Sequence, residues 1–335
     1  MSTIKRVRWG IVSTANIGMA KVIPGIMKSE HSEVVAIASR NLGKAQAAAA
    51  RLGIPKAYGS YEELFADPEI DAIYNPLPNH LHVPMTLAAA KAGKHVLCEK
   101  PIALTATDAE ALRQVPPGII VLEAFMVRFH PQWLRTRDIV RSGELGDVRV
   151  INAVFTYFND DPTNVRNQVD IGGGGIMDIG CYPITAARYL FEDEPKRVVS
   201  LVERDPNFGT DRLASVIADF GNGRQLTFVC STQTAPHQRV QVLGTKAKLE
   251  VIIPFNAPAD ERTAITIDHG GPLDGSLARR EILPACDQYT EQAEAFALAV
   301  LGERPLPWGI DDAIASMRVL DAVIASEKSG GWASV

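Results

Sequence analysis

The stretch Gly93-Lys94-His95-Val96-Leu97-Cys98-Glu99-Lys100-Pro101 decides the fold. Its apolar centre predicts a buried strand from Lys94 to Cys98, and Pro101 ends that strand because proline cannot donate to a central ladder. Lys100 then lies at the carboxyl end of the strand, where open α/β sheets bind their ligands. A lysine in this position can carry a proton if its surroundings lower its pKa towards neutrality. For the motif taken alone, the alternative is an exposed Glu99–Lys100 ion pair.

A nucleotide-binding signal lies further upstream, where the β-rich strand Val7–Val12 runs into a turn and then a helix to about Lys28. In dinucleotide-binding units this turn reads G-x-G-x-x-G, because the backbone must approach a pyrophosphate closely. Here only Gly18 is retained. Small residues still permit close approach, and the hydroxyl of Ser13 or Thr14 can donate to a phosphate. The predicted contacts to the cofactor are Ser13, Thr14, Ala15, Asn16 and Ile17.

The second strand, Val34–Ala38, ends about twenty residues beyond Gly18, where a dinucleotide-binding fold places its ribose-recognition residue. NAD-selective folds carry Asp or Glu there, and a carboxylate would repel a 2′-phosphate. Ser39 and Arg40 instead offer a hydroxyl and a guanidinium, with Lys44 one turn further on. These residues predict NADP rather than NAD. The alternative is that Arg40 and Lys44 are solvated charges at a helix start.

Strands and helices alternate through the first third of the chain, which predicts right-handed βαβ units and a parallel sheet. The strand Ile70–Tyr74 runs into a loop that two prolines keep irregular. In a parallel sheet the carboxyl ends of the strands share one edge, so four of them should meet there: those leading to Ser13, Ser39, Pro76 and Glu99.

The pattern changes after Glu123, and the alternating segment Val148–Phe158 is the first of several longer strands. Asn222-Gly223 is a hairpin signal. Residues 255–283 are expected to form short strands and loops. These features predict a dinucleotide-binding domain over 1–122 and a second α/β domain over 123–335. A final helix at about 311–326 is expected to pack back on the first domain.

A glycine run, Gly172–Gly175, precedes a predicted helix that carries Asp178 and Tyr182. The run would let the backbone pass close to a ligand. Because Asp178 and Tyr182 are four residues apart, they share one helix face and could orient a substrate hydroxyl and relay its proton. The structural alternative is an aspartate that stabilises the helix dipole and a tyrosine half in the core.

Composition excludes several function classes. Lys and Arg number 34 and Asp and Glu 39, so the net charge of −5 gives no footprint for nucleic acid or an anionic membrane. The cysteines lie far apart, which predicts neither a metal site nor disulfides and fits a reducing compartment. We find no signal peptide and no apolar run of about twenty residues, and expect a cytoplasmic protein.

In this order and spacing, four motifs resemble the glucose–fructose oxidoreductase/inositol dehydrogenase (Gfo/Idh/MocA) family over nearly the whole chain. They are Gly10–Gly18, Pro78–His82, Gly93–Pro101 and Gly173–Tyr182. The resemblance implies an N-terminal Rossmann domain and a C-terminal α/β domain with a large, mostly antiparallel open sheet. It also implies a homodimer or homotetramer that forms through the exposed face of that sheet.

The resemblance also implies roles for individual residues. Lys100 is similar to the family's catalytic lysine, Asp178 to its substrate-orienting acid, and Tyr182 stands where many members carry histidine. Tyr182 places the chain near the glucose–fructose oxidoreductase, dimeric dihydrodiol dehydrogenase and NADP-dependent xylose dehydrogenase branch. The implied cofactor contacts beyond the first turn and the 2′-phosphate site are Pro76, Leu77, Asn79, His82, Glu99, Lys100 and Arg166.

The sequence therefore predicts an NADP-dependent oxidoreductase that transfers hydride between nicotinamide and a pyranose carbon, with aldose C1 favoured. One alternative keeps the site and changes the substrate to a trans-dihydrodiol or another cyclic alcohol. A second is a nucleotide-sensing regulatory protein without turnover, against which the joint presence of Lys100, Asp178 and Tyr182 argues. The expected partner is a small sugar or polyol, with no metal.

Overall fold

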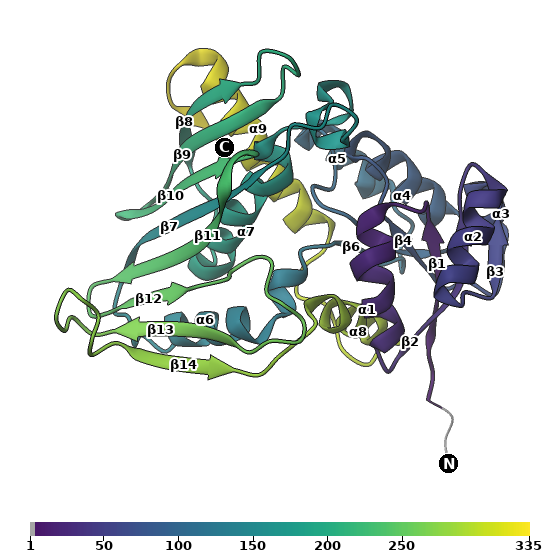
Figure 1. Ribbon diagram of the computed structural model, residues 1–335, viewed down its shortest axis with the longest axis horizontal. Coiled ribbons are helices and arrows are strands. Elements are labelled where there is room, and N and C mark those ends of the chain that lie inside the picture. Colours follow the sequence, from purple (N-terminus) through teal and green to yellow (C-terminus); the bar gives the residue numbers. More distant parts are fainter. Residues whose placement is uncertain (1–3) are drawn as a thin grey trace. The chain divides into compact units, whose positions relative to one another are not determined.

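The computed structural model describes residues 4–335 (Figure 1). Contacts divide the chain into two compact units. Unit 1 comprises the residues up to Met126 and the segment Asp287–Ile314, and unit 2 comprises Val127–Cys286 and Ala315–Val335. The first three residues of the predicted first domain lie outside the described part. The division falls near the predicted boundary, but it also assigns residues 287–314 to unit 1.

Unit 1 is built on a six-stranded sheet in which every neighbouring pair is parallel, with the order β3-β2-β1-β4-β5-β6. The order reverses between β1 and β4, so the carboxyl ends of these two strands flank the crevice where such sheets bind ligands. The predicted parallel Rossmann sheet is confirmed. The strands are β1 Val7–Val12, β2 Ser32–Ala38, β3 Lys56–Tyr58, β4 Ala72–Asn75, β5 His95–Cys98 and β6 Val121–Glu123.

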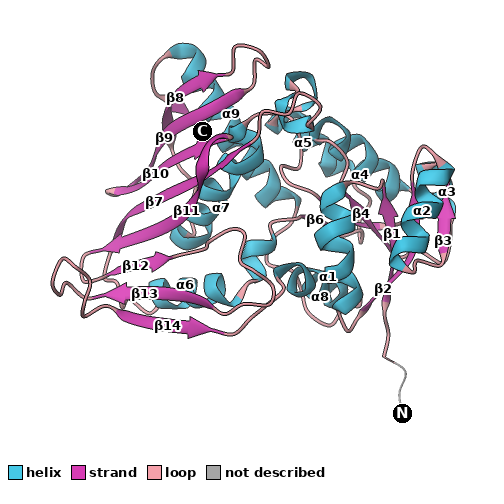
Figure 2. Cartoon of the chain, viewed as in Figure 1, coloured by secondary structure: helices cyan, strands magenta, loops and turns pink. Residues whose placement is uncertain are grey.

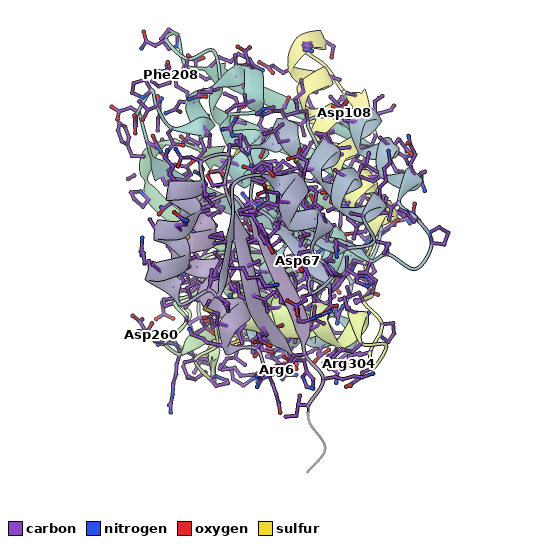
Figure 3. All side chains as sticks on the ribbon, turned by 90° about the vertical axis from the view of Figure 1, so that its right-hand side faces the viewer. Arg6, Asp67, Asp108, Phe208, Asp260 and Arg304 are labelled. Atoms are coloured by element: carbon purple, nitrogen blue, oxygen red, sulfur yellow. The ribbon has the colours of Figure 1, made fainter. Side chains whose placement is uncertain are left out.

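Two helices of unit 1 begin at side-chain caps that the sequence offers. Asn41 Oδ1 accepts from the backbone N–H of Lys44 at 3.0 Å, and Ser60 Oγ accepts from that of Glu63 at 3.2 Å. Asp67, labelled in Figure 3, follows α3 and takes hydrogen bonds from Lys56 and Tyr58. The helices are α1 Ile23–Lys28, α2 Leu42–Leu52, α3 Tyr61–Ala66, α4 His82–Lys91, α5 Ala106–Glu110 and α8 Gln288–Val300, with shorter turns at Gly18–Val22, Asn79–Leu81 and Ala111–Gln114.

Helix α8 belongs to unit 1 because it packs on α1. A Cβ at Gly25 would lie 2.6 Å from Cβ of Tyr289, so only glycine allows this approach. Lys28 Nζ donates to Asp287 Oδ2 at 2.7 Å beside this contact. The packing brings Tyr289, far away in the sequence, into the unit that carries Lys100.

Unit 2 is built on a nine-stranded sheet with the order β14-β13-β12-β11-β7-β10-β9-β8-β15 (Figure 2). Among its described strand pairs, only β7 with β10 is parallel, so the predicted large and mostly antiparallel sheet is confirmed. Asn222 and Gly223 both have positive φ, as a two-residue hairpin requires. The strands are β7 Val148–Phe158, β8 Arg197–Arg204, β9 Asp211–Gly221, β10 Arg224–Ser231, β11 Gln233–Gly244, β12 Lys248–Val251, β13 Thr263–Asp268, β14 Arg279–Leu283 and β15 Ala333–Ser334.

Helices α6 Pro131–Arg141, α7 Cys181–Phe191 and most of α9 Ile310–Ser329 cover one face of this sheet (Figure 1). Trp133 and Phe255 stack with ring centroids 6.2 Å apart in the core beneath them. A π-helical turn, Ile176–Gly180, leads directly into α7. The remaining short turns are Met126–Phe129, Val165–Asn167 and Val169–Ile171.

The final helix differs from its prediction. From Ala315 onward α9 belongs to unit 2, where Ser200 Oγ donates to the carbonyl of Val323 at 2.8 Å. The helix that packs within unit 1 is α8 instead. Within residues 4–335, no helix has the length and apolar content needed to cross a bilayer, and no His, Cys, Asp and Glu side chains cluster as metal ligands.

Candidate active site

The turn after β1 adopts the conformation that glycine usually provides. Ser13 has a φ of +68°, and its Oγ accepts from the backbone N–H of Ala15 at 3.2 Å. This local hydrogen bond offsets part of the cost of a left-handed serine. Gly18 packs close to Tyr74 and Pro76, at the crevice between β1 and β4. That the hydroxyl of Ser13 or Thr14 also donates to a phosphate stays a prediction.

The end of β2 presents cationic groups and no carboxylate. Ser39 is buried, and its Oγ accepts from the N–H of Asn41 at 3.3 Å, whereas Arg40 and Lys44 are exposed at the start of α2. Arg40 also interacts with the hydroxyl of Tyr61. Burial raises the pKa of Tyr61, and the positive charge of Arg40 opposes this rise. The donor set is suited to a phosphate rather than to a bare 2′-hydroxyl.

The loop after β4 is braced by buried polar side chains. His82 is 1% exposed, and its Nδ1 and Nε2 lie 2.7 Å and 2.6 Å from the carbonyl oxygens of Pro101 and Leu77. Burial lowers the pKa of His82 to about 4. Asn75 Oδ1 accepts from the N–H of Leu77 at 3.3 Å. His82 thus joins the loop after β4 to the loop after β5, and a direct cofactor contact by its ring stays a prediction.

Glu99 and Lys100 follow β5 and are half-buried. The hydroxyl of Tyr74, itself fully buried, donates to Glu99 Oε1 at 2.8 Å. The charges of Glu99 and Lys100 both act on the hydroxyl of Tyr289 in α8. Burial raises its pKa, Glu99 raises it further, and Lys100 opposes the shift. Glu99 therefore has a buried tyrosine as its hydrogen-bond partner, and both charges of the pair act on Tyr289.

In unit 2 the carboxylate of Asp178 is held by two donors on one oxygen. Arg166 Nε lies 2.8 Å from Asp178 Oδ2, and the hydroxyl of Tyr157 donates to the same oxygen at 2.7 Å. The Asp178 side chain is 13% exposed. Attraction to Asp178 raises the pKa of Arg166, and by reciprocity the pair favours an ionised carboxylate. These two contacts fix the orientation of the Asp178 carboxylate.

Tyr182 lies one turn beyond Asp178 and is only 6% exposed. Its ring packs against Phe155 and Phe255, with centroids 5.6 Å and 5.3 Å away. The charge of Arg166 interacts with both Asp178 and Tyr182. That the two side chains act together on a substrate hydroxyl stays a prediction.

The glycine run serves a different purpose from the predicted one. A Cβ at Gly173 would lie 2.6 Å and 2.7 Å from the carbonyl oxygens of Arg166 and Gln168, and one at Gly174 would lie 2.1 Å from Asp211 Oδ1. The glycines therefore let the backbone approach the protein's own backbone and a buried carboxylate. The expectation that they make room for a ligand is wrong for Gly173 and Gly174.

Comparison with known proteins identifies the family. Residues 7–115 match the oxidoreductase family with an NAD-binding Rossmann fold, and residues 133–250 match the GFO/IDH/MocA C-terminal domain. The chain belongs to the Gfo/Idh/MocA family. It is an oxidoreductase with the dehydrogenases and reductases of this family as its relatives, as the resemblance implied.

Three Gfo/Idh/MocA proteins illustrate the similarity. An uncharacterized oxidoreductase from Rhizobium meliloti is 47% identical over 334 residues, which cover 98% of this chain and 99% of that one. An NADP(+)-dependent D-xylose 1-dehydrogenase from Haloferax volcanii is 38% identical over 326 residues, covering 96% and 98%. A crystal structure of KijD10, a 3-ketoreductase from Actinomadura kijaniata in complex with NADP and TDP-benzene, has a TM-score of 0.89 and 28% identity, covering 96% of this chain and 98% of that one.

Sequence reasoning missed two tyrosines that contact the family's motif residues in this chain. Tyr74 and Tyr157 lie in strands that predict only core packing. The alternation in Val148–Phe158 places Tyr157 on the same face as Phe155, which is the signal that could have found it.

Proposed function

We propose that the protein is an NADP-dependent oxidoreductase that transfers hydride between nicotinamide and a pyranose carbon, with aldose C1 favoured. The observation that supports the proposal most is the fixed orientation of the Asp178 carboxylate. Arg166 and Tyr157 both contact its Oδ2, one helical turn before Tyr182. Such a group can orient a polyhydroxylated substrate, and a sensor without turnover has no need of it. The relative named as an NADP(+)-dependent xylose 1-dehydrogenase supports both the cofactor and the carbon.

The residues present fit NADP. Arg40, Lys44 and Ser39 would hold the 2′-phosphate, since no carboxylate at the end of β2 repels it. The backbone of Ser13–Ile17, at the start of the first helix, would bind the pyrophosphate. Glu99, Pro76, Leu77 and Asn79 stand at the neighbouring strand ends. The nicotinamide, when bound, supplies or accepts the hydride.

Replacing Arg40 by aspartate should weaken NADP binding by about 10–100-fold, the loss expected for one charge-assisted hydrogen bond plus a new repulsion. NAD binding should be unchanged or tighter, because a carboxylate can accept from a 2′-hydroxyl. Fluorescence titration of both reduced cofactors measures this. Arg51→Asp, at the exposed end of α2, is the matched control. Equal weakening by the two variants would show that Arg40 acts only through net charge.

The chain's own residues would move one proton and orient one sugar. In the oxidative direction the C1–H bond breaks as hydride leaves, and the hydroxyl O–H proton passes to Lys100 with Tyr182 as its partner. Asp178 would hold a neighbouring hydroxyl and so fix which carbon is presented. The product is a lactone, with one NADP reduced and one proton released. In the reductive direction Lys100 and Tyr182 would protonate the developing alkoxide.

The testing experiment is the absorbance change of NADP on addition of a panel of pentoses and hexoses, with NAD run in parallel and a trans-dihydrodiol included. Reduction of NADP by an aldose supports the proposal. Turnover of the dihydrodiol alone would show that the substrate is a cyclic alcohol rather than a sugar. Turnover with NAD alone would overturn the assignment of NADP. If no substrate is turned over while the nucleotide stays bound, the proposal in this form is overturned. An assay with two sugars would then distinguish an enzyme that exchanges hydride between sugars from a sensor without turnover.

We also propose that a second copy of the chain covers the outer face of the unit 2 sheet. That face carries a groove of about 400 Å³ lined from β7, β8, β9 and β10. Leu201 and Ile217 are 77% and 42% exposed there, with Val154, Val199 and Val229 beside them. The lining is mainly apolar and neutral, so it favours a self-complementary partner over a charged one.

Leu201→Glu should reduce the solution mass to that of the monomer, because a two-fold axis would bring two introduced carboxylates into one apolar interface. Light scattering after size exclusion measures the mass. Leu273→Glu, at a position that is fully exposed, should leave the mass unchanged. A wild-type protein that is already monomeric at micromolar concentration would refute this proposal.

A further inference from the structure

A buried aspartate outside the predicted site lies at the start of the helix that carries Asp178 and Tyr182. Asp211 is the first residue of β9 and is 6% exposed. Its Oδ2 accepts from the backbone N–H of Ile176 at 2.5 Å, at the first turn of the π-helical segment that continues into α7. The helix dipole favours a negative charge at this end.

The glycine run wraps this carboxyl group closely. A Cβ at Gly174 would fall 2.1 Å from Asp211 Oδ1, and one at Gly175 would fall 3.2 Å from Asp211 Oδ2. Gly174 also has a φ of +120°, which other residues rarely adopt. Its N–H donates to the carbonyl of Arg166 at 2.8 Å, and its own carbonyl accepts from the N–H of Asp178 at 3.0 Å. Asp211 therefore touches the backbone that places both Arg166 and Asp178.

We propose that Asp211 is a positioning residue for catalysis, whose carboxylate anchors the first helical turn and thereby sets the direction of Asp178, Tyr182 and the Arg166 partner. It contacts no reacting atom itself. The inference rests on the proposed function, since it assigns Asp211 to the same site. The hydrogen bond from Ile176 to Asp211 fixes the start of the helix, two residues before Asp178.

The surroundings of Asp211 make this anchor depend on pH. Burial raises the pKa of Asp211 to about 7, while the N–H of Ile176 and the guanidinium of Arg204 in β8 oppose the shift. Glu327 of α9, which is paired with Arg204 at 2.7 Å, adds to it, and Cys230 of β10 faces the same pocket. As pH falls through about 7 the carboxyl takes up a proton, so the charge–dipole attraction is lost and the hydrogen bond weakens.

Asp211→Asn tests the proposal, because asparagine keeps the shape and an acceptor oxygen but cannot ionise. Reduction of the lactone by NADPH should show an acid limb near pH 7 in the wild type, and the limb should be absent in the variant. At pH 8 we expect kcat to be about fivefold lower, with KM and NADPH affinity within about twofold.

Asp205→Asn is the matched control. Asp205 is equally buried in the turn before β9, but its carboxylate bonds the N–H groups of Asn207 and Phe208 and does not touch the helix (Phe208 is labelled in Figure 3). This variant should keep the wild-type acid limb. In an Asp178→Asn background, Asp211→Asn should cost nothing further, because both act through one group. An additive loss would indicate a general effect on stability and would overturn the proposal.

If Asp211→Asn does not fold, hydrogen exchange of the wild-type protein still tests the role of Asp211. After correction for intrinsic rates, protection of peptide 174–180 should fall between pH 8 and pH 6, while that of the segment around Asp205 stays constant. An unchanged acid limb in Asp211→Asn, or pH-independent protection, refutes the role of Asp211. If Asp178→Asn keeps full activity, the proposed function fails instead, and the two failures are distinguishable.

Discussion

Lys100→Met should lower kcat for sugar oxidation by about 10²–10⁴-fold, the usual contribution of a positioned general acid or base. Methionine is close to lysine in length and keeps the loop between β5 and Pro101 packed, but it cannot accept the hydroxyl proton. The affinity for NADPH should change by less than about threefold, because the contacts proposed for the pyrophosphate and the 2′-phosphate lie at the ends of β1 and β2. Steady-state kinetics and cofactor titration on the same preparation measure the two effects separately.

Lys100→Arg provides a stricter comparison, since arginine keeps the positive charge but is never deprotonated in proteins. If Lys100 carries the proton, arginine should be almost as inactive as methionine, whereas a purely electrostatic role would be rescued. Lys91→Met, at an exposed position at the end of α4, should behave as the wild type. Near-normal turnover of Lys100→Met would show that the proposed mechanism is wrong.

Periodicity and turn chemistry were sufficient to predict most of the fold. β1 and β7 occupy the predicted residues, and the Asn222-Gly223 hairpin forms where two neighbouring strands end. The short strands β13 and β14 lie within residues 255–283, where short strands and loops were expected. The partner of the last helix was beyond sequence reasoning, since an amphipathic stripe does not say which core it faces.

In the candidate site too, the sequence predicts residues that local patterns mark, but it does not predict which residues of other elements contact them. The predicted motif residues Glu99, Lys100, Asp178 and Tyr182 lie at a strand end and on a helix face, where sequence patterns are informative. Their partners come from other elements: Tyr74 for Glu99, Tyr157 and Arg166 for Asp178. The glycine run was misread for the same reason, because glycine reports close approach but not what approaches.

Arg166 combines an implied cofactor contact with an observed ion pair. The resemblance implies an arginine that meets the nicotinamide, and in this chain Arg166 Nε pairs with Asp178 Oδ2 at 2.8 Å. Arg166→Met should lower kcat/KM for the sugar by about tenfold, the cost of one charge-assisted hydrogen bond that orients the Asp178 carboxylate.

Cofactor affinity distinguishes the two roles. If Arg166 acts through Asp178, NADPH binding to Arg166→Met stays within about threefold of the wild type, and Arg166→Lys recovers part of the activity by restoring the charge. A tenfold or greater loss of NADPH affinity would instead establish the nicotinamide contact. Arg149→Met removes a surface arginine paired with Asp147 at 3.0 Å in the same unit and should alter neither quantity. Since ion pairs on the surface contribute little, any effect of that control would indicate nonspecific electrostatics rather than the grip on Asp178.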